Sequence, residues 1–284
     1  MHTIALKSAS GVSATQLHAA FVSAFADYLL GPFELDIAQW PGFLARQGVD
    51  LDQSRVAMNN GEILAFTLVA PRPESGRWRL ATIGALPKAR GSGAAPALLE
   101  DAIERATIAR AGELELEVFA QNGRAVAMYR RHGFQSRHEL FGYHKEIAST
   151  ASAPETVRDV SRDEALAWLD EAARRIADLP LQVTAPILAS LQVPFHAWQS
   201  GDAQLVFLKT GERQLTINSL VDCDESQRHA HLLLKALEHR YPGYSAKVPQ
   251  LQRDDVGGRA LLAAGFERQA LHQMWMTRPV GAPR

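Results

Sequence analysis

The residues best suited to chemistry form a turn of basic and small residues, Lys88-Ala-Arg-Gly-Ser-Gly-Ala-Ala95, which leads into a helical pattern. Backbone N–H groups at a helix start lack partners within the helix, and the helix dipole favours negative charge there. Such a turn can hold a pyrophosphate, and Arg90 can add a charge-assisted hydrogen bond to the same oxygens. The alternative is a purely structural turn between a strand and a helix.

The spacing of this turn matches neither of two well-known phosphate-binding motifs. No Gly-Lys-Ser/Thr follows the glycines, which excludes a Walker loop. Pro96 stands where the third glycine of a Rossmann fingerprint belongs. Because proline is tolerated in the first helical turn, Pro96 predicts that the helix begins near Ser92 or Gly93.

Hydrophobic periodicity and turn residues indicate the elements that position this turn. The pattern predicts a helix over 14–28 capped by Ser13, then a second helix from 34 or 35 to 47 that is broken near Pro41. Asn59-Asn-Gly61 predicts a hairpin turn. The other elements predicted in this half are strands at 3–7, 55–58, 62–69, 78–86, 113–119 and within 134–145, and helices to about 110 and over 122–132.

A stretch of mostly small, uncharged residues, 147–155, is interpreted as a linker between domains at 1–146 and 156–284. The second half repeats the order of the first, and its segment 254–266 echoes 122–134 at an offset of 254 − 122 = 132 residues. Both segments end in Gly-Phe, which favours duplication over coincidence. The elements predicted here are strands at 156–160, 204–209, 214–221, 244–249 and 268–276, and helices at 162–176, 185–191, 225–240 and 254–264.

The composition is that of an ordinary globular protein, with 46% hydrophobic and 21% charged residues in a chain of 284. A net charge of −1 gives no sign of a nucleic-acid or membrane surface. Cys223 is the single cysteine, so no disulfide can form within the chain. The sequence shows no signal peptide and no apolar run of membrane-spanning length, so we expect a cytoplasmic protein.

The chain resembles the GNAT N-acetyltransferase superfamily. The resemblance rests on Leu86-Pro87, Arg90-x-x-Gly93-x-Ala95 and Leu98-Leu99, followed by Leu116-Glu-Val118, Asn122, Ala125, Tyr129 and Gly133-Phe134. It covers roughly 80–145 and is far more specific than the glycine turn alone. It implies an α/β (α+β) fold of two GNAT-like domains in tandem, each with a mixed, mostly antiparallel central sheet flanked by helices.

The resemblance also implies acetyl-CoA as co-substrate, with no metal. The strand ending at Ala85 would splay from the 113–119 strand and pair with the pantetheine arm, which Asn122 would also contact. The cofactor-binding residues carried over from the family are Ala85, Leu86, Pro87, Arg90, Gly91, Ser92, Gly93, Ala94, Ala95, Asn122 and Ala125.

Acetyl transfer to an amine needs a neutral nucleophile, a stabilised oxyanion and a proton for the departing thiolate. A thiol has a pKa of about 8.5 and tyrosine of about 10, so Tyr129 can donate a hydrogen bond or proton to the sulfur, although it could instead be a packing residue. A backbone N–H near Leu86 is the expected oxyanion donor. Glu117 could deprotonate the amine through water, or belong to a solvated strand face with Glu113 and Glu115.

These residues predict an N-acetyltransferase that moves an acetyl group directly from acetyl-CoA to a primary amine of a small molecule or peptide. The alternatives are a non-catalytic acyl-CoA-binding or regulatory protein, and an acyltransferase that uses a longer acyl-CoA. Tyr28 and Glu34 are candidates for the acceptor pocket, because that region covers substrates in the family. We expect no nucleic-acid or membrane partner, and a monomer or homodimer.

The second half departs from the cofactor motif. Asp222-Cys-Asp-Glu-Ser-Gln-Arg228 precedes its long helix, with no glycine and three acids that would repel a pyrophosphate. At the 132-residue offset, Leu261 replaces Tyr129 and Asp254 replaces Asn122. We therefore expect a degenerate GNAT-like domain that binds no CoA.

Overall fold

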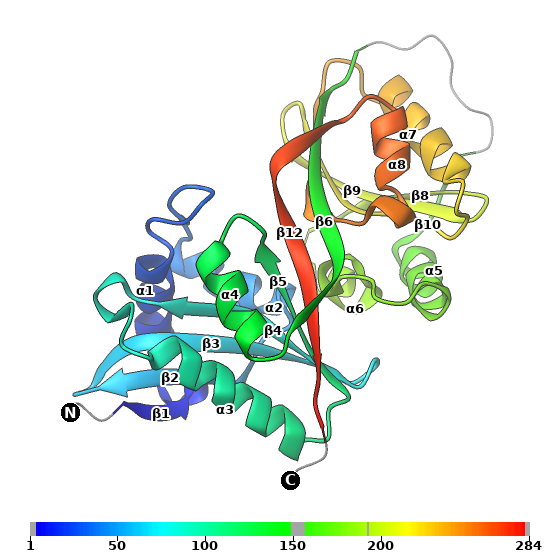
Figure 1. The fold of residues 1–284 in the computed structure, drawn as a ribbon. Helices are drawn as coiled ribbons and strands as arrows, with labels where there is room; N and C mark the ends of the chain where they lie inside the picture. Colours follow the sequence, from blue (N-terminus) through cyan, green and yellow to red (C-terminus); the bar gives the residue numbers. More distant parts are fainter. Residues whose placement is uncertain (1–3, 149–156, 192, 282–284) are drawn as a thin grey trace. The chain divides into compact units, whose positions relative to one another are not determined.

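The computed structural model describes residues 4–148, 157–191 and 193–281 (Figure 1). Contacts divide the chain into two compact units. The first unit comprises Met1–Val118, Asn122–Arg137 and Trp275–Arg284, and the second comprises Phe119–Gln121 and His138–Met274. These bounds differ from the predicted domains, because the strands near 140 and 275 each contribute to both units. Residues 149–155 of the predicted linker, and Thr156, lie outside the described residues.

The first unit is a mixed sheet with hydrogen-bonded order β1-β2-β3-β4-β5-β12. All pairings from β1 to β4 are antiparallel, and β4 pairs with β5 in parallel. Its strands are β1 (Ala5–Ser8), β2 (Asp50–Asn59), β3 (Glu62–Arg72), β4 (Arg77–Ala85), β5 (Glu113–Phe119) and the end of β12 (Glu267–Pro279). Its helices are η1 (Ala9–Gly11), α1 (Ala14–Ala24), η2 (Ile37–Gln39), α2 (Trp40–Arg46), η3 (Pro87–Ala89), α3 (Ala94–Ile108) and α4 (Gly123–Arg131).

Helices cover both faces of this sheet. Side chains of α1 and α2, among them Phe21 and Trp40, pack against Phe66 on one face of β3. Ala94 and Leu98 of α3 pack against Ala65, the next residue of β3 and therefore on the opposite face. This arrangement places the start of α3 beside the end of β4, since Ala85 joins the same cluster.

Two predicted helix bounds were wrong in the first unit. The helix predicted to reach Tyr28 ends at Ala24, because a turn closed by the Gly31 N–H to the Tyr28 carbonyl (2.9 Å) follows it. Pro41 does not break a helix but stands in the first turn of α2, where its missing N–H has no helical partner to lose. The predicted helix start near Gly93 is confirmed.

The second unit repeats this arrangement. Its sheet has the order β12-β6-β11-β10-β9-β8-β7. Strands β10 and β11 pair in parallel. The pairings of β6 with β11, β10 with β9, β9 with β8 and β8 with β7 are antiparallel. Its strands are β6 (Gln135–Glu146), β7 (Arg158–Asp159), β8 (His196–Ser200), β9 (Ala203–Gly211), β10 (Gln214–Asp222) and β11 (Ser245–Gln252), with most of β12. Its helices are α5 (Arg162–Arg175), η4 (Leu181–Val183), α6 (Ala185–Ala189), α7 (Arg228–Arg240), η5 (Asp254–Val256) and α8 (Gly258–Ala263).

Figure 1 shows α7 and α8 on one side of β8–β10, with α5 and α6 on the other. The first helix of each unit begins with a capping box, Ser13 with Gln16 in α1 and Ser161 with Glu164 in α5. Each unit also carries its parallel strand pair immediately beside a long helix. The predicted α/β fold with two related domains is thus confirmed, although β8 has no counterpart among the predicted strands.

Candidate active site

The glycine turn before α3 presents backbone donors that no protein group uses. Gly91 and Gly93 have φ of +84° and +87°, and a Cβ added to either would meet nothing within 4 Å. The N–H groups of Arg90 and Ser92 donate to Pro87 and Ala89 carbonyls. Within the described residues, the N–H groups of Gly91, Gly93 and Ala95 have no protein acceptor. Three such N–H groups at the start of a 15-residue helix are donors that could hold an anion.

The parallel strands next to this turn separate where the family resemblance requires it. β4 and β5 pair from Arg77 with Glu113 to Leu80 with Leu116, whereas β4 stays paired with β3 as far as Ala85. The predicted splay is therefore present. It leaves the last residues of β4 with one strand edge that β5 does not cover.

The oxyanion donor predicted near Leu86 is a choice between the N–H groups of Leu86 and its neighbours, and strand pairing distinguishes them. The Leu86 N–H donates to the Leu64 carbonyl at 2.9 Å, so it is not available to stabilise an oxyanion. Because successive N–H groups of a strand point to opposite edges, the Ala85 N–H points away from β3. Ala85 is the better donor, and the sequence missed this because the direction of each N–H depends on the register between β3 and β4.

Helix α4 carries the other residues of the motif. Asn122 caps it, with Oδ1 accepting from the Ala125 N–H at 3.2 Å. Tyr129 is 5% exposed, and its ring meets that of Phe134 edge-on. Burial, and then the charge of Tyr28, raise the pKa of Tyr129 well above its ordinary value. Tyr129 therefore keeps its proton and is a hydrogen-bond donor at any physiological pH.

Arg90 is held by a carboxylate at the end of α1. Its guanidinium donates to both oxygens of Asp27 at 2.5 and 2.6 Å, and to the Ala24 carbonyl at 3.2 Å. The hydrogen bond from Arg90 lowers the pKa of Asp27. This contact brings the loop after α1, which contains Tyr28, to the glycine turn. No local pattern in the sequence indicates this contact, because its partners are 63 residues apart.

Glu117 is not an exposed base. Its carboxylate accepts from the Arg79 Nε at 2.8 Å and Nη2 at 2.7 Å, and both side chains are 3% exposed. Glu115 is likewise buried and pairs with Arg72 at 2.6 Å. The interpretation of a solvated strand face is therefore wrong. Arginines of β3 and β4 neutralise these carboxylates, and the pairing argues against Glu117 as a base without testing it.

The second unit has its own groups where the first has an open turn. Before α7, Asp222 is buried, and its carboxylate accepts from the N–H groups of Asp224 and Ala230, each at 2.9 Å. A carboxylate at a helix start satisfies the donors and the dipole that would otherwise attract an anion. Asp254 accepts from Tyr143 at 2.8 Å and does not cap α8 as Asn122 caps α4.

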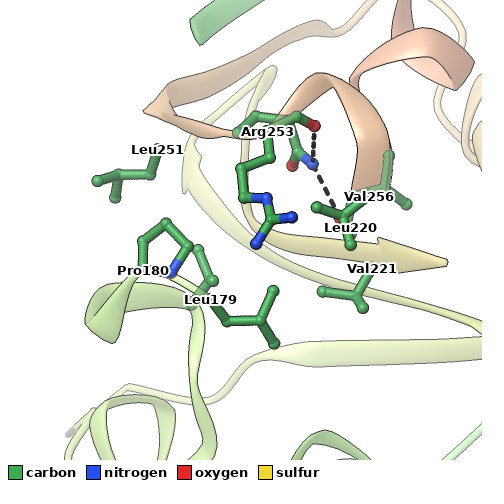
Figure 2. A pocket seen from close by; sticks show the side chains of 9 residues that line it. Leu179, Pro180, Leu220, Val221, Leu251, Arg253 and Val256 are labelled. Atoms are coloured by element: carbon green, nitrogen blue, oxygen red, sulfur yellow. Dashed lines mark hydrogen bonds between the residues drawn. The ribbon is translucent and has the colours of Figure 1, made fainter. Parts of the chain in front are cut away.

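The splay of the second unit is bridged by a side chain. β10 and β11 pair only from Gln214 to Thr216, and beyond that point the Gln252 amide donates to the Leu220 carbonyl at 3.1 Å. Leu220 and Gln252 both line a small pocket, and Figure 2 shows Leu179, Leu220 and Val256 of its lining. The Arg253 guanidinium beside it is fully engaged with Asp255 and with the carbonyls of 177 and 178. A side-chain hydrogen bond from β11 to β10 therefore bridges the splay that corresponds to the uncovered edge of β4.

Two further features concern the described residues. Within 4–148, 157–191 and 193–281, no three His, Cys, Asp or Glu side chains are grouped so that they could hold a metal ion. Within the same ranges, none of the helices has the length and apolar character that crossing a membrane requires.

The fold and the site together define an α/β protein of two related units, in which the first unit has a glycine turn at the start of a long helix. Residues 17–134 match the model of the acetyltransferase (GNAT) family. Among curated proteins, no sequence matches the chain. The match to the GNAT family model thus covers part of the first unit, and the second unit has a related fold.

Solved structures resemble the whole chain in fold. A GCN5-related N-acetyltransferase from Sphaerobacter thermophilus is 13% identical, with a TM-score of 0.67 over 99% of this chain and 96% of that one. A tandem GNAT protein from the clavulanic acid biosynthesis pathway is 18% identical, with a TM-score of 0.65 over 100% of both. A putative acetyltransferase from Pyrococcus horikoshii is 12% identical, with a TM-score of 0.66 over 99% and 91%. The chain therefore has the fold of tandem GNAT proteins.

Proposed function

We propose that the first unit transfers an acetyl group from acetyl-CoA to a primary amine. The observation that carries this proposal is the turn whose Gly91, Gly93 and Ala95 N–H groups lack protein acceptors at the start of α3. These donors and Arg90 suit the pyrophosphate, and the uncovered edge of β4 suits the amide groups of the pantetheine arm. Bound there, acetyl-CoA would supply the activated acetyl group.

In the proposed reaction, the amine nitrogen forms a bond to the thioester carbonyl carbon, and the carbon–sulfur bond breaks. The amine loses one proton and the thiolate gains one, so an N-acetyl amine and a free thiol result. The Ala85 N–H is oriented to donate to the oxygen on which charge develops. Because both burial and a neighbouring tyrosine keep Tyr129 protonated, it acts mainly as a hydrogen-bond donor to the sulfur.

A turnover screen tests this function directly. Full-length protein is incubated with acetyl-CoA and a panel of primary amines, and thiol release is followed together with the mass of the acetylated product. We expect amine-dependent release, with the gain of one acetyl group per acceptor. Acetyl-CoA binding by calorimetry without turnover of any amine would instead favour a non-catalytic acyl-CoA-binding protein.

A further inference from the structure

The loop between α1 and α2 exposes an unusual amount of apolar surface. Leu29, Leu30, Phe33 and Ile37 are 45%, 56%, 37% and 44% exposed. Among the described residues they are four of the seven large hydrophobic side chains with this degree of exposure, although the stretch spans only nine residues. Surface apolar residues that gather in one segment indicate a binding surface, whereas scattered ones do not.

This loop is ordered and lies at the proposed acetyl-CoA site. Asp27 at its start bonds to Arg90 of the glycine turn, at 2.5 and 2.6 Å. The ring of Phe33 packs edge-on against Phe21 of the core, with centroids 5.2 Å apart. The Leu35 carbonyl hydrogen-bonds the His18 ring at 2.7 Å. The exposed apolar side chains are therefore held in place beside the turn.

The charge of the loop is negative. Residues 26–38 contain three acids and no lysine or arginine. Asp27 is neutralised by Arg90, and Asp36 accepts from the Ala38 N–H as the cap of η2. Glu34 is exposed, and within the described residues it has no ion-pair partner. Asp36 is also exposed, and no ion pair to it is present among the described residues, so the apolar surface carries two carboxylates and is complementary to a cation with an apolar body.

We infer that the acceptor is a primary amine on an apolar aliphatic or aromatic body, bound by the loop 29–37. This inference rests on the proposed acetyl transfer and specifies its acceptor. The apolar body contacts side chains such as Leu30, and Glu34 attracts the ammonium form before the amine loses its proton. A polyamine or aminosugar, with several charges and little apolar surface, fits this loop poorly.

The experiment compares phenethylamine with spermidine as acceptors for the full-length protein. We expect kcat/KM to be at least about 10-fold higher for phenethylamine, the size of discrimination that an apolar contact provides. Leu30→Ser should raise KM for phenethylamine by about 10-fold with little change in kcat. Ile108→Ser is the matched control, because Ile108 is 68% exposed but lies on α3, outside the loop. Glu34→Gln should raise the same KM severalfold, unlike Glu104→Gln.

Calorimetric titration of phenethylamine in the presence of CoA separates this inference from the proposed function. Binding that Leu30→Ser weakens, without turnover of any amine, would support an apolar amine site on the loop but would contradict acetyl transfer. A preference for spermidine, or no effect of Leu30→Ser on phenethylamine, would overturn the inference while leaving acetyl transfer intact. A change of oligomeric state in Leu30→Ser with unchanged kinetics would also overturn it, since the loop would then contact a second copy.

Discussion

The helix starts before α3 and α7 show how one fold can be open to an anion in one unit and closed in the other. Before α3, two glycines with positive φ leave three N–H groups without protein acceptors. Before α7, Asp222 places its own carboxylate on the Ala230 N–H. The helix start offers N–H donors and a favourable dipole in both units. The units differ in whether a side chain of the protein supplies the negative charge at that position.

The strands beside these helices differ in the same sense. The uncovered edge of β4 ends at Ala85, whereas the amide of Gln252 reaches across from β11 to the Leu220 carbonyl of β10. Tyr129 on α4 has its counterpart in Leu261 on α8, which has no hydroxyl to donate. The two units share one fold but differ at the helix start, the splay and the hydroxyl donor, and we expect these three differences to exclude acetyl-CoA from the second unit.

The largest expected effect is on acetyl-CoA binding. Arg90→Glu combined with Gly93→Asp should abolish binding measured by calorimetry, because two negative charges then face the pyrophosphate site. The fold should survive, since a Cβ at Gly93 meets nothing within 4 Å and aspartate tolerates positive φ.

Arg228→Glu, at the first residue of α7, is the matched change in the second unit and should leave binding unaltered. The unsubstituted protein should bind one acetyl-CoA per chain. A stoichiometry of two would show that Asp222 does not close the second unit, and persistent binding in the double variant would remove the glycine turn from the site.

Loss of the Tyr129 hydroxyl tests the third difference between the units. Tyr129→Phe should lower kcat roughly 10²–10⁴-fold if chemistry limits turnover, with acetyl-CoA affinity little changed. Because burial raises its pKa, Tyr129 should deprotonate only above its ordinary value of about 10. The rate should therefore show no loss from this group below about pH 10.

The effect on kcat and the pH dependence of the rate can each contradict the prediction independently. An unaltered kcat in Tyr129→Phe would remove the residue from the reaction. A loss of rate centred well below pH 10 that disappears in Tyr129→Phe would show that the hydroxyl titrates more readily than its burial allows.

The buried ion pair of β4 and β5 distinguishes the units in stability. Glu117→Gln should lower the free energy of unfolding by on the order of 3 kcal/mol in urea denaturation, because Arg79 then remains buried without a countercharge. The corresponding strand β11 carries no acid, so it cannot form the matching ion pair with β10.

The pH profile decides whether Glu117 is also a base. We expect Glu117→Gln to leave the shape of the kcat/KM profile unchanged, as a structural ion pair requires. Loss of its acidic limb in the variant, with thermal stability accounted for, would support the base.

The smallest effect concerns the carboxylate that approaches the open turn. Asp27→Asn should tighten acetyl-CoA binding by about 2- to 5-fold, since an exposed ion pair competes only weakly for Arg90. Asp27 stays ionised at neutral pH because Arg90 lowers its pKa, so the competition is present under assay conditions. The gain should shrink at high salt.

Glu62→Gln is the control, because Glu62 pairs with Lys88 in the same exposed segment but does not contact Arg90. Weaker binding in Asp27→Asn would contradict competition. It would show that Asp27 orients Arg90 for the pyrophosphate.

Local features of the sequence predicted much of the first unit. Pro96 and Gly93 fixed the start of α3. Asn122 and Gly133 likewise predicted the start and the end of α4. These predictions succeed because caps and turns depend on residues within four positions of one another. The echo between 122–134 and 254–266 also predicted the duplication that the two units display.

Local patterns in the sequence did not predict the ion-pair partners of the charged residues. Glu117 meets Arg79 across 38 positions, and Arg90 meets Asp27 across 63. The Leu86 N–H is used because β3 and β4 pair in one register and not another. The last strand, beginning with the second unit and ending with the first, likewise follows from sheet pairing.

By itself, the sequence predicted the starts of α1, α3, α4 and α5, and it distinguished the glycine turn before α3 from the acidic segment before α7, because the backbone conformation of a turn is set by its own residues. Only the tertiary structure decided which charges are already satisfied. Strand register and helix packing choose the partner of each buried side chain, and they separate an open donor at Gly93 from the engaged one at Leu86.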